Sequence, residues 1–458
     1  MAYRPIDFNI IQNEFEQRFP NGKLFEGKNF NYIKLVQHAL SYAMTNADDK
    51  LLKKNPFGSW WLYKLKTRIH ARRKRRLNFL PQKSEGILFL EGRRKLKLPT
   101  GEEISPITHL IRETVLSTEY SWWDTTGAFE KEADFSVKNL SNWFPPTNEI
   151  QHEIYSELKG VLRKIKESDV FSKIEFQYVE SAFNVFFESF RRWHALLSVA
   201  NPKTLVGITH YHNEGCLAAA KLLGIKTVEL QHGLISKHDL YYVYPTKYSE
   251  ALSKGIFPNE IWLFGNFWRE VLEKGAESAF MKPIVIGNFT TDVAVKTDQL
   301  EKENRVLLCA QKNLSQPYIE WIRFMKKQIL PLHPEWKLIV KLHPLESQVE
   351  KYKAEADDRV DVLSVSASLN EELKRARIQV SIYSTTFFDA IGMSVKNYSL
   401  NEIGYSLDYA SEMVAMGVAE SLKNGEDVIE KFQSAPSFPD HLTREDIFAA
   451  FQPRLMDF

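Results

Sequence analysis

Three short segments place side chains that could do chemistry directly after apolar runs. The first is Gln231-His232-Gly233, which follows "KTVEL". A histidine can accept a proton near neutral pH, and a glycine allows a tight turn in which the backbone approaches a ligand. Because ligands bind at the carboxyl ends of strands in α/β sheets, we expect His232 to face a substrate.

The second segment is "KLIVKLHPLES", in which an apolar run stops at His343 and Pro344. Proline cannot continue a strand and holds the residue before it in an extended conformation, so the imidazole is expected at the carboxyl edge of a sheet. A histidine that only caps a strand is the alternative. The same Leu-His-Pro tripeptide also occurs at 332–334, in a predicted helix-to-strand loop.

The third segment is "SIYSTTFFDAIGM", in which Ser384, Thr385 and Thr386 lie between a predicted strand and a predicted helix. One hydroxyl is enough to cap a helix. Three in succession, together with the free amides and the dipole of the helix, favour an anion such as phosphate. We therefore predict that His343 and this hydroxyl cluster hold a nucleotide phosphate between them.

The order of these motifs resembles that of bacterial GT-B glycosyltransferases that make surface polysaccharides. It is similar to the capsule Kdo and sialic acid transferases and to the CDP-glycerol glycerophosphotransferases of teichoic acid synthesis. The shared features are "QHG" in a first α/β domain, then "KLHP" and "S-x-x-S-T-T" in a second, all within 231–389.

The resemblance implies a binding site for the phosphate of a CMP- or CDP-activated donor. Its residues in this chain would be His343, Ser384, Thr385 and Thr386. Asp389 stands at the helical position where many such proteins carry a glutamate, which leaves recognition of the ribose or base open.

The base that deprotonates the acceptor hydroxyl is expected in the first domain. By resemblance to the glycerophosphotransferases, His232 is the first candidate. Glu91, at the end of the first predicted strand, and Glu214, in "THYHNEGC", are the rivals, because carboxylates serve as the base in many GT-B enzymes. Glu214 alternatively compensates the dipole of the helix that it begins.

No metal or cofactor is expected beyond the nucleotide-activated donor itself. His210 and His212 could suggest zinc together with His232, but such a site needs further convergent ligands. The chain has no Asp-x-Asp triplet of the kind that holds a metal-bound nucleotide sugar, which fits a metal-independent enzyme.

Composition excludes several classes of protein. With 60 basic and 58 acidic residues among 458, the chain as a whole is not built to bind nucleic acid, and 44% hydrophobic content is globular. The two cysteines, Cys216 and Cys309, lie in apolar stretches and fit a reducing cytosol. We see neither a secretory signal nor an apolar run long enough to span a membrane, and expect a cytoplasmic protein.

One local segment is strongly basic. Residues 60–76 combine Trp60, Trp61 and Tyr63 with eight cations, a composition typical of a segment that lies on an anionic membrane surface. This predicts peripheral association with the inner face of the membrane. A solvated basic helix is the alternative, and RNA binding is disfavoured because no RNA-binding module accompanies it.

The chain as a whole has the alternation of strands and helices typical of parallel, doubly wound sheets. We predict a GT-B fold, in which two Rossmann-like α/β domains face a cleft. The first is 81–287 and accepts the glycan. The second is 288–458, binds the nucleotide donor and ends in a helix that packs back across the domains. A helical, basic extension precedes them at 1–80.

The predicted function is therefore a transferase of capsule, O-antigen or related lipopolysaccharide synthesis. It would move a sugar, or a glycerophosphate as in the glycerophosphotransferases, from a nucleotide-activated donor to a glycan or lipid-linked acceptor. Two alternatives remain. One is a UDP-sugar 2-epimerase of GT-B shape, which would act without an acceptor. The other is a non-catalytic scaffold of a polysaccharide assembly complex.

Overall fold

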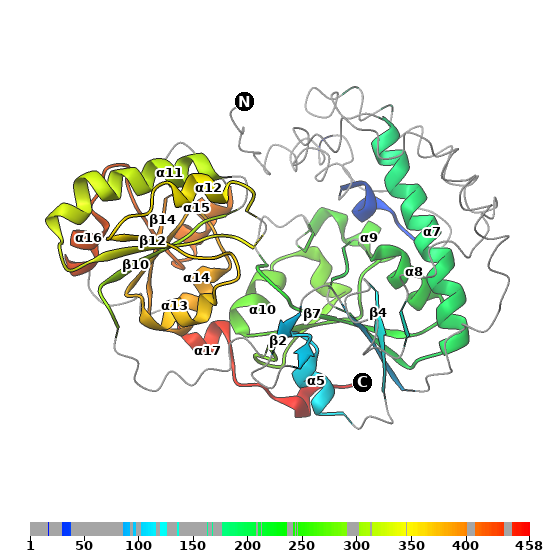
Figure 1. Ribbon diagram of the computed structural model, residues 1–458. Helices are drawn as coiled ribbons and strands as arrows, with labels where there is room; N and C mark the ends of the chain where they lie inside the picture. Colours follow the sequence, from blue (N-terminus) through cyan, green and yellow to red (C-terminus); the bar gives the residue numbers. More distant parts are fainter. Residues whose placement is uncertain are drawn as a thin grey trace, which may run out of the picture. The chain divides into compact units, whose positions relative to one another are not determined.

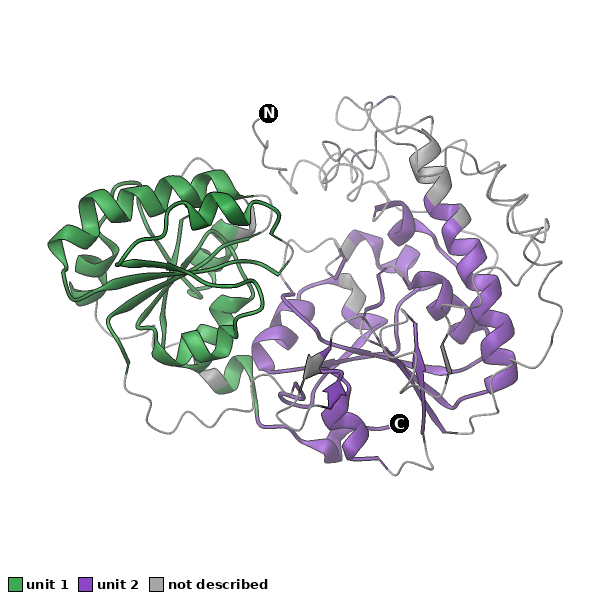
Figure 2. Cartoon of the chain, viewed as in Figure 1, with its two compact units in different colours: residues 1–7, 292–449 green, residues 8–291, 450–458 purple. Residues whose placement is uncertain are grey.

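The computed structural model describes two compact units (Figure 2). Unit 1 comprises 1–7 and 292–449, and unit 2 comprises 8–291 and 450–458. The described residues are 17, 30–37, 86–91, 95–97, 102–115, 120–125, 135–136, 163, 167, 176–207, 209–211, 213–235, 241–242, 244, 246–290, 302–311, 314–344, 346–400, 408–434 and 442–458. The predicted membrane-binding segment 60–76 lies outside them, as does most of the predicted extension.

Unit 2 is built on a parallel sheet whose first strand lies inside it. From β1 the chain adds β4 and β5 on one side and then returns to add β6, β7, β8 and β9 on the other. The strands are β1 (Ile87–Glu91), β4 (Tyr120–Asp124), β5 (Phe135–Ser136), β6 (Thr204–Gly207), β7 (Lys226–Leu230), β8 (Glu260–Leu263) and β9 (Lys282–Val285). The topological switch point, where a doubly wound sheet binds its ligand, therefore lies between β1 and β6.

The remaining elements of unit 2 are mostly helices. They are the hairpin β2 (Leu96–Lys97) and β3 (Glu103–Ile104), α5 (His109–Glu113), α7 (Phe176–Ala200), α8 (Glu214–Leu222), η4 (Thr246–Tyr248), α9 (Ser249–Leu252), α10 (Asn266–Leu272), η5 (Ala276–Ala279) and η9 (Pro453–Leu455). Helix α8 packs closely on α7 at Gly215, where a β-carbon would lie 2.6 Å from the backbone nitrogen of Phe190. A glycine is required there to let the two helices approach.

Two segments remote in sequence complete unit 2. Residues 30–37, which fall inside the predicted separate extension, pack against α7 through Tyr32 and form a hydrogen bond from Asn31 N to Lys254 O of 2.8 Å. At the other end of the chain, Phe458 packs on Trp262 with ring centroids 5.2 Å apart. The expected last helix is short, since α17 spans only Arg444–Ile447, and the residues after it from 450 onward belong to unit 2.

Unit 1 repeats the same winding around β10. The chain adds β11 and β12 on one side of β10, and then β13, β14 and β15 on the other, all parallel. The strands are β10 (Arg305–Cys309), β11 (Lys337–Lys341), β12 (Val360–Val362), β13 (Ile378–Ser381), β14 (Lys396–Ser399) and β15 (Glu420–Ser421). Its switch point lies between β10 and β13.

Helices cover both faces of the unit 1 sheet (Figure 1). They are α11 (Ser315–Phe324) with its π-helical continuation η7 (Met325–Ile329) and η8 (Leu330–Leu332), α12 (Val349–Lys353), α13 (Leu369–Arg375), α14 (Thr386–Gly392), α15 (Asp408–Ala415), α16 (Val428–Ser434) and α17. Val306 and Leu308 face the core under α11, whereas Leu307 and Cys309 face the core under α13 and α14. Strands buried on both faces explain the nearly continuous apolar runs in the sequence.

The predicted fold class is confirmed at this level, because each unit is an α/β unit with a parallel, doubly wound sheet. The division between the units falls at 291/292, where the sequence predicted 287/288. Within the described part of the chain, no helix is both long enough and apolar enough to cross a membrane.

Candidate functional site

The glutamine that follows β7 holds the turn after that strand in place. The Gln231 side chain is completely buried; its Oε1 accepts a hydrogen bond of 2.9 Å from Phe264 N, and its Nε2 donates one of 3.0 Å to Gly233 O. Gln231 thus joins the carboxyl ends of β7 and β8 and fixes the turn that carries His232. Among the described residues, nothing lies within 4 Å of where a β-carbon on Gly233 would stand.

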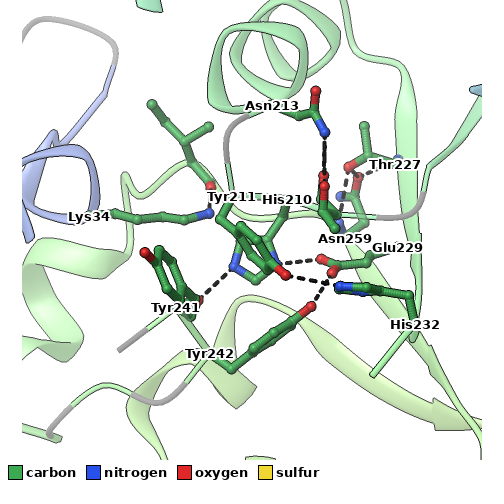
Figure 3. A network of polar contacts seen from close by, with 12 residues as sticks. Lys34, His210, Tyr211, Asn213, Thr227, Glu229, His232, Tyr241, Tyr242 and Asn259 are labelled. Atoms are coloured by element: carbon green, nitrogen blue, oxygen red, sulfur yellow. Dashed lines mark hydrogen bonds and ion pairs between the residues drawn. The ribbon is translucent and has the colours of Figure 1, made fainter. Parts of the chain in front are cut away.

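His232 is half-buried and is paired with a tyrosine from the segment that follows the neighbouring strand. Its Nε2 lies 2.9 Å from the hydroxyl of Tyr211, which follows β6 (Figure 3). The Tyr211 ring in turn packs on Tyr241, with centroids 4.7 Å apart. The imidazole predicted as the base therefore has a defined orientation at the carboxyl edge of unit 2, while its role as the base stays a prediction.

A buried charged network lies beside this pair (Figure 3). His210 Nδ1 is hydrogen-bonded to the carboxylate of Glu229, and its Nε2 donates to Tyr241 O over 2.7 Å. The second oxygen of Glu229 accepts from the Tyr242 hydroxyl at 2.6 Å.

The zinc hypothesis for these histidines finds no support in this network. Since both ring nitrogens of His210 are engaged, this ring is not available to a metal in this arrangement. His212, its partner in the zinc hypothesis, lies outside the described residues.

Lys34 extends the network from a distant part of the sequence. Its Nζ donates to Ile256 O over 2.8 Å and lies 4.8 Å from the centre of the Phe257 ring. Burial lowers the pKa of Lys34 to about 8, against the opposing effects of Glu214 and Glu229. Glu214, predicted as a rival base, begins α8 and is 6% exposed within this group of buried charges.

Glu91 lies at the end of β1, beside the switch point of unit 2. It accepts a hydrogen bond from Thr108 Oγ1 and lies 3.7 Å from Arg112 Nε. Burial raises the pKa of Glu91 to about 7, although Ser105 and Arg112 lower it. With 1% exposure its carboxyl contacts these side chains instead of solvent, and its role as the base also remains a prediction.

The paired tryptophans of β4 serve mainly to pack this region. Trp123 is 2% exposed and stacks on Trp193, with ring centroids 6.4 Å apart. The Arg112 guanidinium lies 3.9 Å from the centre of the Trp122 ring. Trp123 is therefore part of the core.

In unit 1 the hydroxyl cluster follows β13, which borders the switch point. Ser384 Oγ accepts hydrogen bonds from Thr386 N at 3.2 Å and from Thr386 Oγ1 at 2.9 Å. Gln379 donates to the same threonine hydroxyl. Thr385 is exposed and its side chain forms no cap, so Ser384 supplies the capping oxygen for α14.

His343 and Asp389 complete the predicted donor site. His343 is half-buried two residues beyond β11, and its carbonyl accepts from Glu346 N over 2.9 Å. Because β11, β10 and β13 are parallel neighbours, His343 and Ser384 lie at the same edge of one sheet. Asp389 lies on α14, partly buried. Their contacts with a nucleotide stay predictions.

Several residues of these edges were not singled out from the sequence. Gln311 follows β10 just as His343 follows β11, so the rule that selected the histidines could have found it. Tyr318 and Lys34 carry no comparable signal, because only the fold brings α11 and residues 30–37 to these positions. Within the described residues, no three His, Cys, Asp or Glu side chains gather to hold a metal ion.

Comparison with known proteins gives structural likenesses only. No family model matches the sequence, and neither does any curated protein. Among solved structures, the UDP-GlcNAc 2-epimerase from Methanocaldococcus jannaschii is 11% identical, with 81% of this chain and 97% of that chain covered and a TM-score of 0.47. MnaA of S. aureus, in a co-structure with UDP, is 12% identical over 81% and 92%, with a TM-score of 0.46. MurG of Acinetobacter baumannii is 13% identical over 76% and 88%, with a TM-score of 0.41. The α/β assignment rests on the strand orders themselves.

Proposed function

We propose that this chain is a glycosyltransferase of GT-B type that acts in the synthesis of a surface polysaccharide. It transfers a sugar from a CMP- or CDP-linked donor to a glycan or lipid-linked acceptor. The observation that carries the proposal is the carboxyl edge of unit 1, where His343 and the hydroxyls of Ser384 and Thr385 follow the two strands that flank β10. This is the place where a doubly wound sheet binds a nucleotide.

The proposed chemistry divides between the two units. The donor phosphate binds to unit 1 through His343 and the hydroxyl cluster. The acceptor hydroxyl attacks the anomeric carbon, the bond from that carbon to the phosphate oxygen breaks, and the nucleotide leaves with the electron pair. His232 takes the proton of the attacking hydroxyl. In addition, the cationic segment 60–76 would hold the protein against an anionic membrane surface.

Calorimetric titration with CMP, CDP, UDP and GDP tests the donor site. We expect a cytidine nucleotide to bind and His343→Ala to abolish binding. The matched control is His333→Ala, which makes the same change in the other Leu-His-Pro tripeptide and should leave binding unchanged. Binding of UDP or GDP alone would contradict the cytidine donor.

A second assay separates the proposed transferase from its alternatives. Purified protein is incubated with the nucleotide sugar with and without acceptor. Release of nucleotide that requires the acceptor supports transfer, and conversion of a UDP-sugar without acceptor would replace it with epimerisation. Failure to bind any of the four nucleotides would favour the scaffold.

A further inference from the structure

Gln311 bridges the two strands at the switch point of unit 1. It lies two residues beyond the end of β10, and its side-chain Oε1 accepts a hydrogen bond of 3.4 Å from Tyr383 N, two residues beyond the end of β13. The same oxygen accepts from the Tyr318 hydroxyl at 3.0 Å. The amide oxygen of Gln311 therefore links the segment after β10 to the segment after β13 and to Tyr318 of α11.

The hydrogen bonds around Gln311 determine which atom of its side-chain amide faces Tyr383 N. Ser381 Oγ donates to Cys309 O over 2.8 Å, and Ile382 N donates to the Tyr318 oxygen over 3.1 Å. The Tyr318 hydroxyl lies 3.0 Å from Gln311 Oε1 and 3.2 Å from Ser381 Oγ, and it can donate its hydrogen to either oxygen. Burial raises the pKa of Tyr318, so its phenol keeps that hydrogen. Since Tyr383 N can only donate, the atom that faces it must be the amide oxygen of Gln311.

The position of the Gln311 amide oxygen also fixes the position of its amide nitrogen, Nε2. With Oε1 held by two donors, Nε2 carries two hydrogens on the opposite side of the amide group. No described residue accepts a hydrogen bond from it, and Gln311 is only half-buried. A preoriented donor thus remains at the carboxyl edge between β10 and β13, where a ligand of a doubly wound sheet is bound.

We propose that Gln311 is a ligand-binding residue whose side-chain amide donates a hydrogen bond to a phosphate oxygen of the nucleotide donor. This inference rests on the proposed function and adds a residue to its donor site. A phosphate oxygen is the ligand atom that suits this position, because it accepts hydrogen bonds. The two groups that orient Gln311, the Tyr318 hydroxyl and Tyr383 N, are neutral donors. The exposed Thr385 hydroxyl, beyond β13 at the same edge, offers a second donor of the same kind.

Gln311→Glu is the sharpest test, because it keeps an oxygen for Tyr318 and Tyr383 and replaces the donating nitrogen with an acceptor. Calorimetry should show CMP and CDP binding about ten- to a hundredfold more weakly, the range for a lost hydrogen bond to a charged group. Cytidine, which lacks the phosphate, should bind as it does to the unaltered protein. Gln433→Glu, an exposed change of the same kind on α16, is the matched control and should change neither affinity.

The outcomes distinguish this inference from the function on which it rests. Binding by Gln311→Glu equal to that of the unaltered protein, with binding lost in His343→Ala, would overturn the inference alone. If the unaltered protein binds no nucleotide, both the inference and the proposed function fail. Equally weaker binding of cytidine and CDP, with a lower unfolding midpoint, would show that Gln311 is structural.

Tyr318→Phe gives a second measurement. It frees the Gln311 amide to reorient and should weaken CDP binding several-fold while cytidine binding is unchanged.

Discussion

The carboxyl edges of the two units differ in charge although their sheets are wound alike. In unit 2 the edge contains ionisable side chains that are nearly or fully buried, among them Glu91, His210, Glu229 and Lys34. In unit 1 the hydrogen bonds around Gln311 and Tyr318 join neutral groups, and the buried cation at this edge, Lys341 at the end of β11, donates only to backbone carbonyls. The strand order sets where a ligand is bound, and the side chains decide whether that place is suited to move protons or to hold an anion.

The buried charges of the unit 2 edge also have a cost in stability. A charge is retained in a protein interior only where partners compensate its lost hydration. The unit 2 edge meets this condition with residues from several elements, including Lys34 from a segment far from β7 in sequence. The neutral hydrogen bonds around Gln311 carry no such cost, whereas the buried Lys341 at the same edge is compensated by the carbonyls of Leu342 and Val365.

The largest predicted effect tests whether the charged edge performs the chemistry. His232→Ala should lower the rate of sugar transfer by about a hundred- to ten-thousandfold, the usual contribution of a general base. Nucleotide binding should be unchanged, because it is assigned to unit 1. A transfer assay and calorimetry on the same preparation measure both. His194→Ala, the same substitution on α7, should keep full activity, and equal activity of the two variants would remove the proposed role of His232.

The next prediction concerns the stability of the charged edge. Glu229→Ala should lower the free energy of unfolding by about 3 to 5 kcal/mol, because it leaves the buried His210 without its partner. Glu229→Gln should cost much less, since an amide can donate to His210 Nδ1 and still accept from Tyr242. Urea unfolding measures both, with the exposed Glu273→Ala as control. Equal losses for the alanine and glutamine variants would show that the ionic charge itself is required.

A pH prediction follows from Glu91. Its folded-state pKa of about 7 lies above the ordinary 4.5, so the folded protein binds the proton more tightly than the unfolded chain does. This contribution is fully present below pH 4.5 and is lost as the pH rises through 7, on the order of 3 kcal/mol in all. Glu91→Gln, which mimics the protonated carboxyl, should remove this part of the pH dependence. Parallel urea titrations at pH 5 and pH 8 compare the two proteins, and an identical pH dependence would contradict the burial of this carboxyl.

Much of the fold could be predicted from the sequence, because strands buried on both faces leave continuous apolar runs. The runs before His232 and His343 are indeed strands, at β7 and β11. The segment "TLVGITH", 204–210, has the composition of a strand over its whole length, but β6 ends at Gly207, and His210 instead meets Glu229 and Tyr241. Strand ends depend on such tertiary hydrogen bonds, which a local pattern does not contain.

The candidate sites were predictable only in part, and for a similar reason. A motif directly after a strand, such as Ser384 to Thr386, is placed by the topology alone. The partners of those residues come from elements remote in sequence, as Tyr318 does for Gln311 and Lys34 does for Glu214. Their contribution depends on packing, so a single sequence does not single them out.

The smallest predicted effect would show how the charged edge orients its base. Tyr211→Phe removes the hydroxyl that lies 2.9 Å from His232 Nε2 and should lower kcat about five- to tenfold, as expected for one hydrogen bond, with KM unchanged. Tyr241→Phe, on the ring that packs against Tyr211, is the control and should have no such effect on kcat. If Tyr211 acts only through His232, adding Tyr211→Phe to His232→Ala should cost nothing further, because the ring that it orients is gone. A full additional loss in the double variant would mean that Tyr211 contacts the substrate itself, and the base would then have to be oriented by another residue at this edge.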